Sequence, residues 1–188
     1  TASLVWGLPE HLQLPSPGSL AEQMTGQDAE QRVLGWLGEV AGGTPDIGYA
    51  IEAITLAWTL PHLAECISLD AWFALVTHLV DASGEARTVD SEHEPLLSQL
   101  LAGELPLTLA CLFPELAPCR ALSEDARRIL AAGVVDVLDG EGLIHGNYVF
   151  LARAMLACWT RCHAIGRQMK HPCFAPSEQS QLGDMVRH

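Results

Sequence analysis

The sequence predicts an all-α protein. Apolar residues recur at helical spacing along most of the chain, and no segment alternates apolar and polar residues for long enough to form a strand. Short loops separate the helical segments, and short loops make successive helices antiparallel neighbours. We therefore expect antiparallel helical hairpins, roughly six to eight helices in a bundle or a partial α/α toroid.

Capping residues and glycine or proline stops divide the chain into successive helices. A hydroxyl or acidic side chain before an apolar run, such as Asp28 or Ser68, satisfies free N–H groups at the helix start, and Gly or Pro ends the run. The segment 147–169 is apolar nearly all round, which predicts a central helix buried on most sides. We expect helices over about residues 28–41, 45–60, 69–84, 92–103, 106–113, 124–139 and 147–169, and from 176 onward.

The domain organisation is predicted to be simple. Residues 1–18 hold three prolines and two glycines, so we expect an irregular N-terminal arm whose Leu4, Val5, Trp6 and Leu8 pack on the body. Residues 19–188 are long enough to form one helical domain with its own core. The chain starts at Thr1 and stops just after a helix start, which suggests a fragment of a longer chain.

Composition and charge exclude several classes. Hydrophobic residues are 49% and charged residues 18% of the chain, which excludes a disordered protein. Ten Lys and Arg against 23 Asp and Glu give a net charge of −13, which argues against nucleic acid and anionic membranes as partners. Half of the ten basic residues lie near the C-terminus, so an anionic ligand is expected there. These five are Arg153, Arg161, Arg167, Lys170 and Arg187.

The compartment is predicted from the cysteines and the N-terminus. A chain of this size with an ample core does not need its six cysteines as disulfides, so we expect reduced thiols. No signal-peptide pattern precedes the helices, and cytoplasmic localisation is the default expectation.

One candidate site is the connector over residues 139–148. It gathers a carboxylate (Glu141), an imidazole (His145), an amide (Asn147) and a phenol (Tyr148), groups suited to proton transfer and to carboxylate binding. The alternative is a plain helix connector, with Gly140 ending one helix and Asn147 starting the next.

A second candidate is a zinc site. Cys158 and Cys162 share a helical face, and His171 and Cys173 follow the helix end, so three thiolates and an imidazole could bind zinc tetrahedrally. The alternatives are that the cysteines are small core residues, or that Cys173 forms a disulfide with Cys158 or Cys162. No other cofactor is expected.

Arginines and tryptophans supply further candidates. Arg153, Arg161 or Arg167 could hold a ligand carboxylate in a bidentate pair, or could pair with an acid of the chain itself. Trp159 could stack on a sugar ring, and the same holds for Trp36, Trp58 and Trp72. The alternative is that these tryptophans belong to the core, because they fall in phase with aliphatic neighbours.

Three phrases between residues 103 and 169 resemble the N-terminal helical region of bacterial heparinase II/III-like proteins. They are LFPEL (112–116), LDGEGLIH (138–145) and LACWTRC (156–162). The resemblance implies an incomplete α/α toroid, normally followed by a β-sandwich domain, so a C-terminal β-domain is the expected missing partner. It also implies a polysaccharide lyase that cleaves uronic acid-containing glycans by β-elimination.

The resemblance implies roles for residues near these phrases. His145 or Tyr148 would act as base or acid, Asn147 would bind the uronate carboxylate, and Arg153 would support the charge. Glu141, Trp159 and Arg161 are the expected substrate-binding residues. Two other functions stay open: a non-catalytic helical scaffold that binds a protein or forms a homo-oligomer, and a zinc-stabilised helical domain.

Overall fold

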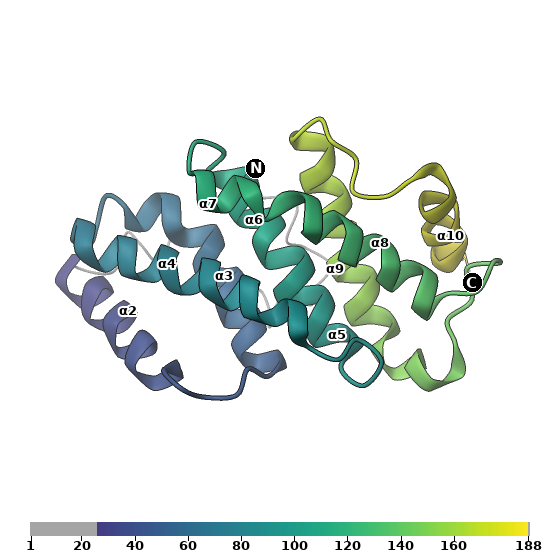
Figure 1. Ribbon diagram of the computed structural model, residues 1–188, viewed down its shortest axis with the longest axis horizontal. Helices are drawn as coiled ribbons and strands as arrows, with labels where there is room; N and C mark the ends of the chain where they lie inside the picture. Colours follow the sequence, from purple (N-terminus) through teal and green to yellow (C-terminus); the bar gives the residue numbers. More distant parts are fainter. Residues whose placement is uncertain (1–25, 188) are drawn as a thin grey trace.

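Helices make up most of the computed structural model, which describes residues 26–187 (Figure 1). Within this range there is no strand, only an isolated antiparallel bridge between Leu138 and Ile144. The predicted all-α class is therefore confirmed. The predicted arm over residues 1–18 lies outside the described residues.

The elements follow one another closely along the chain. In order they are α2 (Gly26–Val40), α3 (Ile47–Leu63), α4 (Leu69–Glu85), the 3-10 turn η3 (Ala86–Thr88), α5 (Pro95–Ser98), the π-helical η4 (Gln99–Glu104), α6 (Leu105–Leu112), α7 (Ala117–Ala121), α8 (Ser123–Val137), the 3-10 helix η5 (Gly146–Leu151), α9 (Ala152–Gln168) and α10 (Pro176–Arg187). Ser68 caps α4 as predicted, its hydroxyl accepting from the N–H of Ala71. Asp28 instead lies in the first turn of α2.

The two short helices predicted over 92–103 and 106–113 form one continuous helix. α5, η4 and α6 run without a break, and η4 widens to π-helical turns just before Pro106. Proline has no N–H, and in a regular α-helix its ring clashes with the carbonyl four residues earlier. The widened turns relieve that clash, so the break expected between Gly103 and Pro106 does not form.

This continuous helix is the centre of the fold, and the prediction for 147–169 is wrong in that respect. Every residue from Pro95 to Ala110 is buried, and the helix contacts α3, α4, α8 and α9. α9 instead buries one face, which includes Met155, and exposes Arg153 and Thr160 on the other. Its alanines counted as apolar in the sequence, but several of them face outward.

By length and composition, Pro95–Leu112 could cross a membrane, with a mean hydropathy of 1.4. In this structure 83% of the segment is buried among the other helices. Burial inside the protein accounts for its apolar character.

Candidate functional site

The connector over 139–148 is built around turn chemistry. The Asp139 carboxylate accepts from the backbone N–H groups of Glu141 and Leu143, at 2.8 and 2.9 Å. Gly142 has a φ of 78°, and a Cβ there would meet the carbonyl oxygen of Gln181 in α10 at 2.6 Å. α10 therefore closes over this turn, and only glycine fits at position 142.

Of the predicted catalytic residues, Tyr148 lines the cleft described below. His145 and Asn147 are exposed, as are Glu141 in the turn and Arg153 at the start of α9. Tyr148 is half-buried, and its hydroxyl lies 3.5 Å from the carbonyl oxygen of Glu92. The structure thus places Tyr148 at the cleft and the other predicted catalytic residues on the exposed surface.

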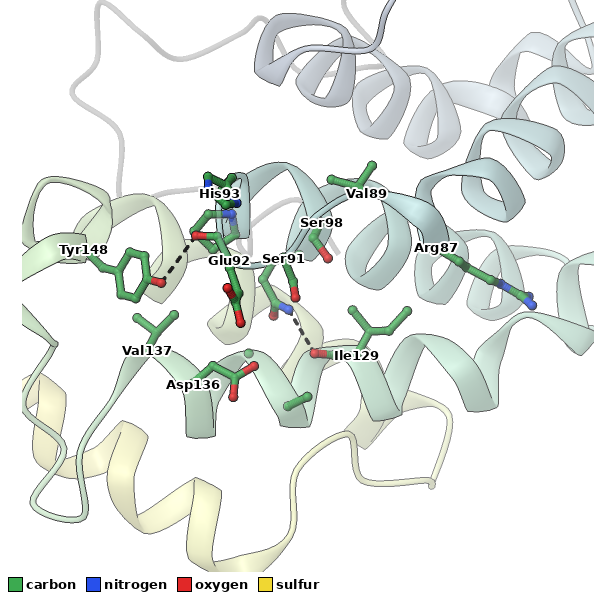
Figure 2. Close-up of a pocket in the computed structure, with 14 residues that line it drawn as sticks. Arg87, Val89, Ser91, Glu92, His93, Ser98, Ile129, Asp136, Val137 and Tyr148 are labelled. Carbon is green, nitrogen blue, oxygen red and sulfur yellow. Dashed lines mark hydrogen bonds between the residues drawn. The ribbon is translucent and has the colours of Figure 1, made fainter.

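The cleft has a volume of about 570 Å³ and lies between the segment 87–99 and α8 (Figure 2). Its size is in the usual range for small-molecule sites. It is lined by polar and apolar side chains in similar number, with Tyr148 at one end and Arg87 at the other. The lining residues are Arg87, Val89, Ser91, Glu92, His93, Pro95, Ser98, Gln99, Ile129, Ala132, Gly133, Asp136, Val137 and Tyr148.

The two basic side chains of the cleft each have an acidic partner. Nη1 of Arg87 lies 2.8 Å from Oδ2 of Asp125, and Nδ1 of His93 lies 2.9 Å from Oδ2 of Asp90. The backbone N–H of Glu92 and then the His93 side chain lower the pKa of Asp90. Asp90 therefore stays ionised beside the imidazole.

Gln99 joins the cleft to the core. Its Nε2 donates to the carbonyl oxygen of Ile129 at 2.9 Å, and its Oε1 accepts from the indole N–H of Trp159 at 2.8 Å. Gly133 leaves the room for this side chain, because a Cβ there would lie 2.3 Å from Nε2 of Gln99. Trp159 is 0% exposed, so it belongs to the core and offers no ring face to a sugar, which corrects its predicted role in substrate binding.

Arg161 is bound to an acid of its own chain. Its Nε and Nη2 lie 2.5 and 2.8 Å from the two carboxylate oxygens of Glu104, which is 0% exposed at the end of η4. Burial opposes the charge of Arg161, but the hydrogen bonds and the charge of Glu104 outweigh this effect and raise the pKa of the guanidinium. Arg161 therefore pairs with an acid of the chain itself, which was one of the two predicted alternatives. This pairing corrects its predicted role in binding a ligand carboxylate.

The predicted zinc ligands are only partly brought together. Cys158, Cys162 and Glu104 place their donor atoms within 4.8 Å of one another, whereas His171 is exposed and outside this group. Cys173 donates from Sγ to the carbonyl oxygen of Cys162 at 3.2 Å.

The chemistry of this cluster favours protonated thiols. Burial raises the pKa of Cys162, and it raises the pKa of Cys173 to about 11. Arg161 already holds both oxygens of Glu104. All six cysteines lie in the described part of the chain and are free thiols. The predicted alternative of a disulfide between Cys173 and Cys158 or Cys162 is therefore not observed.

An aromatic cluster that the sequence did not reveal joins α2, α3 and α4. The hydroxyl of Tyr49 lies 2.9 Å from Nε2 of His78, and the rings of Trp36 and Tyr49 are stacked at 5.7 Å. The indole N–H of Trp36 donates to Glu52 at 2.8 Å. Because these residues are far apart in sequence, no local motif could have predicted the cluster.

The Tyr49–His78 bond should make stability depend on pH. Burial lowers the pKa of His78 below 6.5, against the charges of Asp81 and Glu85, and burial raises the pKa of Tyr49 to about 12. Because the unfolded chain binds this proton more readily, the stabilisation is complete above pH 6.5 and is lost as the pH falls through the folded pKa.

We expect the thermal midpoint of the native protein to fall between about pH 7.5 and 5.5 more steeply than that of the His78→Asn variant. Calorimetry at several pH values measures both slopes. The matched control is His62→Asn, which removes an exposed histidine of α3 and should keep the native slope. Equal slopes in the native protein and in His78→Asn would show that His78 carries no such linkage.

Comparisons of the chain with protein-family models, with curated proteins and with solved structures gave no match. A function for this chain is therefore inferred from its residues and from the cleft.

Proposed function

We propose that this chain is the helical domain of a heparinase II/III-like polysaccharide lyase, which cleaves uronic acid-containing glycans by β-elimination. The observation that supports the proposal is the position of Tyr148. This residue lies three positions after the phrase 138–145 that resembles the family, and it lines an open cleft. The mixed polar and apolar lining suits a sugar, which presents hydroxyls at its edges and C–H groups on its faces.

The reaction needs a base and an acid on the two sides of the glycosidic linkage. The base removes the proton from C5 of the uronate, the electron pair forms the C4–C5 double bond, and the C4–O bond breaks as the leaving oxygen takes a proton. Tyr148 and His93 bring a phenol and an imidazole to the same cleft. We assign Tyr148 to one proton transfer and His93 to the other. Three exposed residues lie close to Tyr148 in the sequence: His145, Asn147 and Arg153. We assign them to contacts with the part of the glycan chain that extends out of the cleft.

The test is incubation of the protein with heparin, alginate and related uronate polymers while the ultraviolet absorbance of the unsaturated product is followed. We expect product with at least one polymer, and a rate reduced about 100-fold or more in the Tyr148→Phe variant. Tyr49→Phe makes the same chemical change away from the cleft and should retain activity. Absence of product with every uronate polymer would count against the proposal.

A second candidate, a non-catalytic helical scaffold, is favoured by a different observation. Large apolar side chains are exposed around η5, with Leu143 at 43%, Val149 at 57% and Phe150 at 81%. Grouped apolar residues of this kind mark protein-binding or self-association surfaces. A protein that yields no product and elutes as a dimer would fit this candidate.

A further inference from the structure

Two carboxylates of the cleft face each other across the space between its walls. Figure 2 shows the side chains of Glu92 and Asp136 pointing toward one another from opposite walls. Neither carboxylate makes an ion pair or a side-chain hydrogen bond within the described range 26–187. Arg87 and His93 are engaged by Asp125 and Asp90, so the lining has a negative centre.

A buried hydroxyl without a partner opens onto the same cleft. Ser98 is only 5% exposed, and its side chain makes no hydrogen bond with any other group in the part of the chain described here. Figure 2 shows its oxygen directed toward the space between α5 and α8. The Ser98 hydroxyl is therefore open to the inner part of the cleft and available to a polar group of a ligand.

The size and walls of the cleft favour an organic cation over a bare metal ion. Calcium takes six to eight oxygen ligands at close range. The groups of three or more acidic, histidine or cysteine donors that the described residues bring together do not include Glu92 or Asp136. Val89, Ile129 and Val137 add apolar surface along a cleft of about 570 Å³, which suits a carbon frame.

We propose that this cleft binds a ligand through a primary ammonium group, carried either by a polyamine or by an amino sugar. The ammonium donates to the carboxylates of Glu92 and Asp136, and a polar group of the same ligand bonds to the Ser98 hydroxyl. The carbon frame lies on the apolar walls. The proposal does not rest on the lyase activity. A negative centre that holds an ammonium group disfavours a uronate carboxylate, so amine binding and uronate cleavage are separate tests of this cleft.

The test is calorimetric titration of the protein with two probes, spermidine and a fully deacetylated glucosamine tetramer. The N-acetylated tetramer serves as the probe without ammonium groups. We expect binding of at least one of the two amines, no binding of the acetylated tetramer, and weaker binding as salt is added. Binding of spermidine alone identifies a polyamine site, and binding of the tetramer alone identifies an amino-sugar site.

Matched variants connect binding to these side chains. In Glu92→Gln/Asp136→Asn, affinity for the amine should fall by about tenfold or more, because two charge-assisted hydrogen bonds are weakened. Glu39→Gln/Glu65→Gln removes the same charge from exposed acids elsewhere and should keep native affinity. Both carboxylates of the cleft are exposed, so the first variant should also keep the native unfolding midpoint. The affinity of Ser98→Ala for the amine is a second measurement at the same site.

Three results would overturn the proposal. One is that neither amine binds the native protein. Another is that the cleft variant binds the amine as tightly as the native protein does. The third is an equal loss of affinity in the control variant, which would show that net charge alone attracts the probes.

Discussion

Replacing Arg161 with methionine is expected to lower the free energy of unfolding by about 3–5 kcal/mol. Glu104 is 0% exposed, and both of its carboxylate oxygens bond to Arg161. Methionine fills much of the space of the arginine stem but leaves the carboxylate buried without a counter-charge, which is the costly way to break such a pair. For a chain of this length the thermal midpoint should fall on the order of 10 °C.

Two further variants separate lost charge from lost packing. Arg167→Met alters an exposed arginine two turns along the same helix and should change stability by less than about 0.5 kcal/mol. Arg161→Lys keeps the charge but not the planar fork that spans both oxygens, so it should lie between the native protein and Arg161→Met. Chemical denaturation measures all three. An Arg161→Met variant as stable as Arg167→Met would mean that Glu104 is solvated rather than held by Arg161.

Replacing Gly133 with alanine should destabilise the protein by about 2–3 kcal/mol, although alanine favours helix. The new Cβ would lie 2.3 to 2.6 Å from the three terminal atoms of the Gln99 side chain. Gln99 cannot move aside without breaking its hydrogen bonds to Ile129 and Trp159. The steric overlap therefore becomes a loss of buried hydrogen bonds.

The matched control is Gly38→Ala in α2. No atom lies within 4 Å of a Cβ at this position, so alanine there should stabilise the protein by up to about 1 kcal/mol. A double variant, Gln99→Ala/Gly133→Ala, removes the overlap together with the amide. Its destabilisation should be smaller than the sum of the two single effects, because both substitutions act on one contact. Additive effects would show that Gly133 and Gln99 are independent.

Local signals were sufficient for the fold class and for many helix boundaries. Ser68 caps the N-terminus of α4 as predicted, and the predicted start of the last helix coincides with Pro176, where α10 begins. The error at Pro106 had a different origin. Whether the helix continues through Gly103 and Pro106 depends on how much apolar surface the continuous helix buries in the core. The sequence near Pro106 does not contain that information.

The candidate site was less predictable, because its geometry depends on distant pairs. Gln99 and Trp159 are 60 positions apart, and Glu104 and Arg161 are 57 apart. The composition of α9 suggested ligand-binding groups at Trp159 and Arg161, but each is satisfied by the π-helical segment. The cleft residues Glu92, Ser98 and Asp136 belong to no motif and converge only because the segment 87–99 folds over α8.

The amide of Gln99 has a consequence for measurement. One side chain both lines the cleft and holds the indole N–H of Trp159, deep in the core. Indole emission responds to hydrogen bonding and polarity at that N–H. A ligand that forms a hydrogen bond with Gln99 would therefore change the fluorescence of Trp159 without contacting this residue. Of the five tryptophans, Trp159 is therefore the one whose emission should respond to occupancy of the cleft through Gln99.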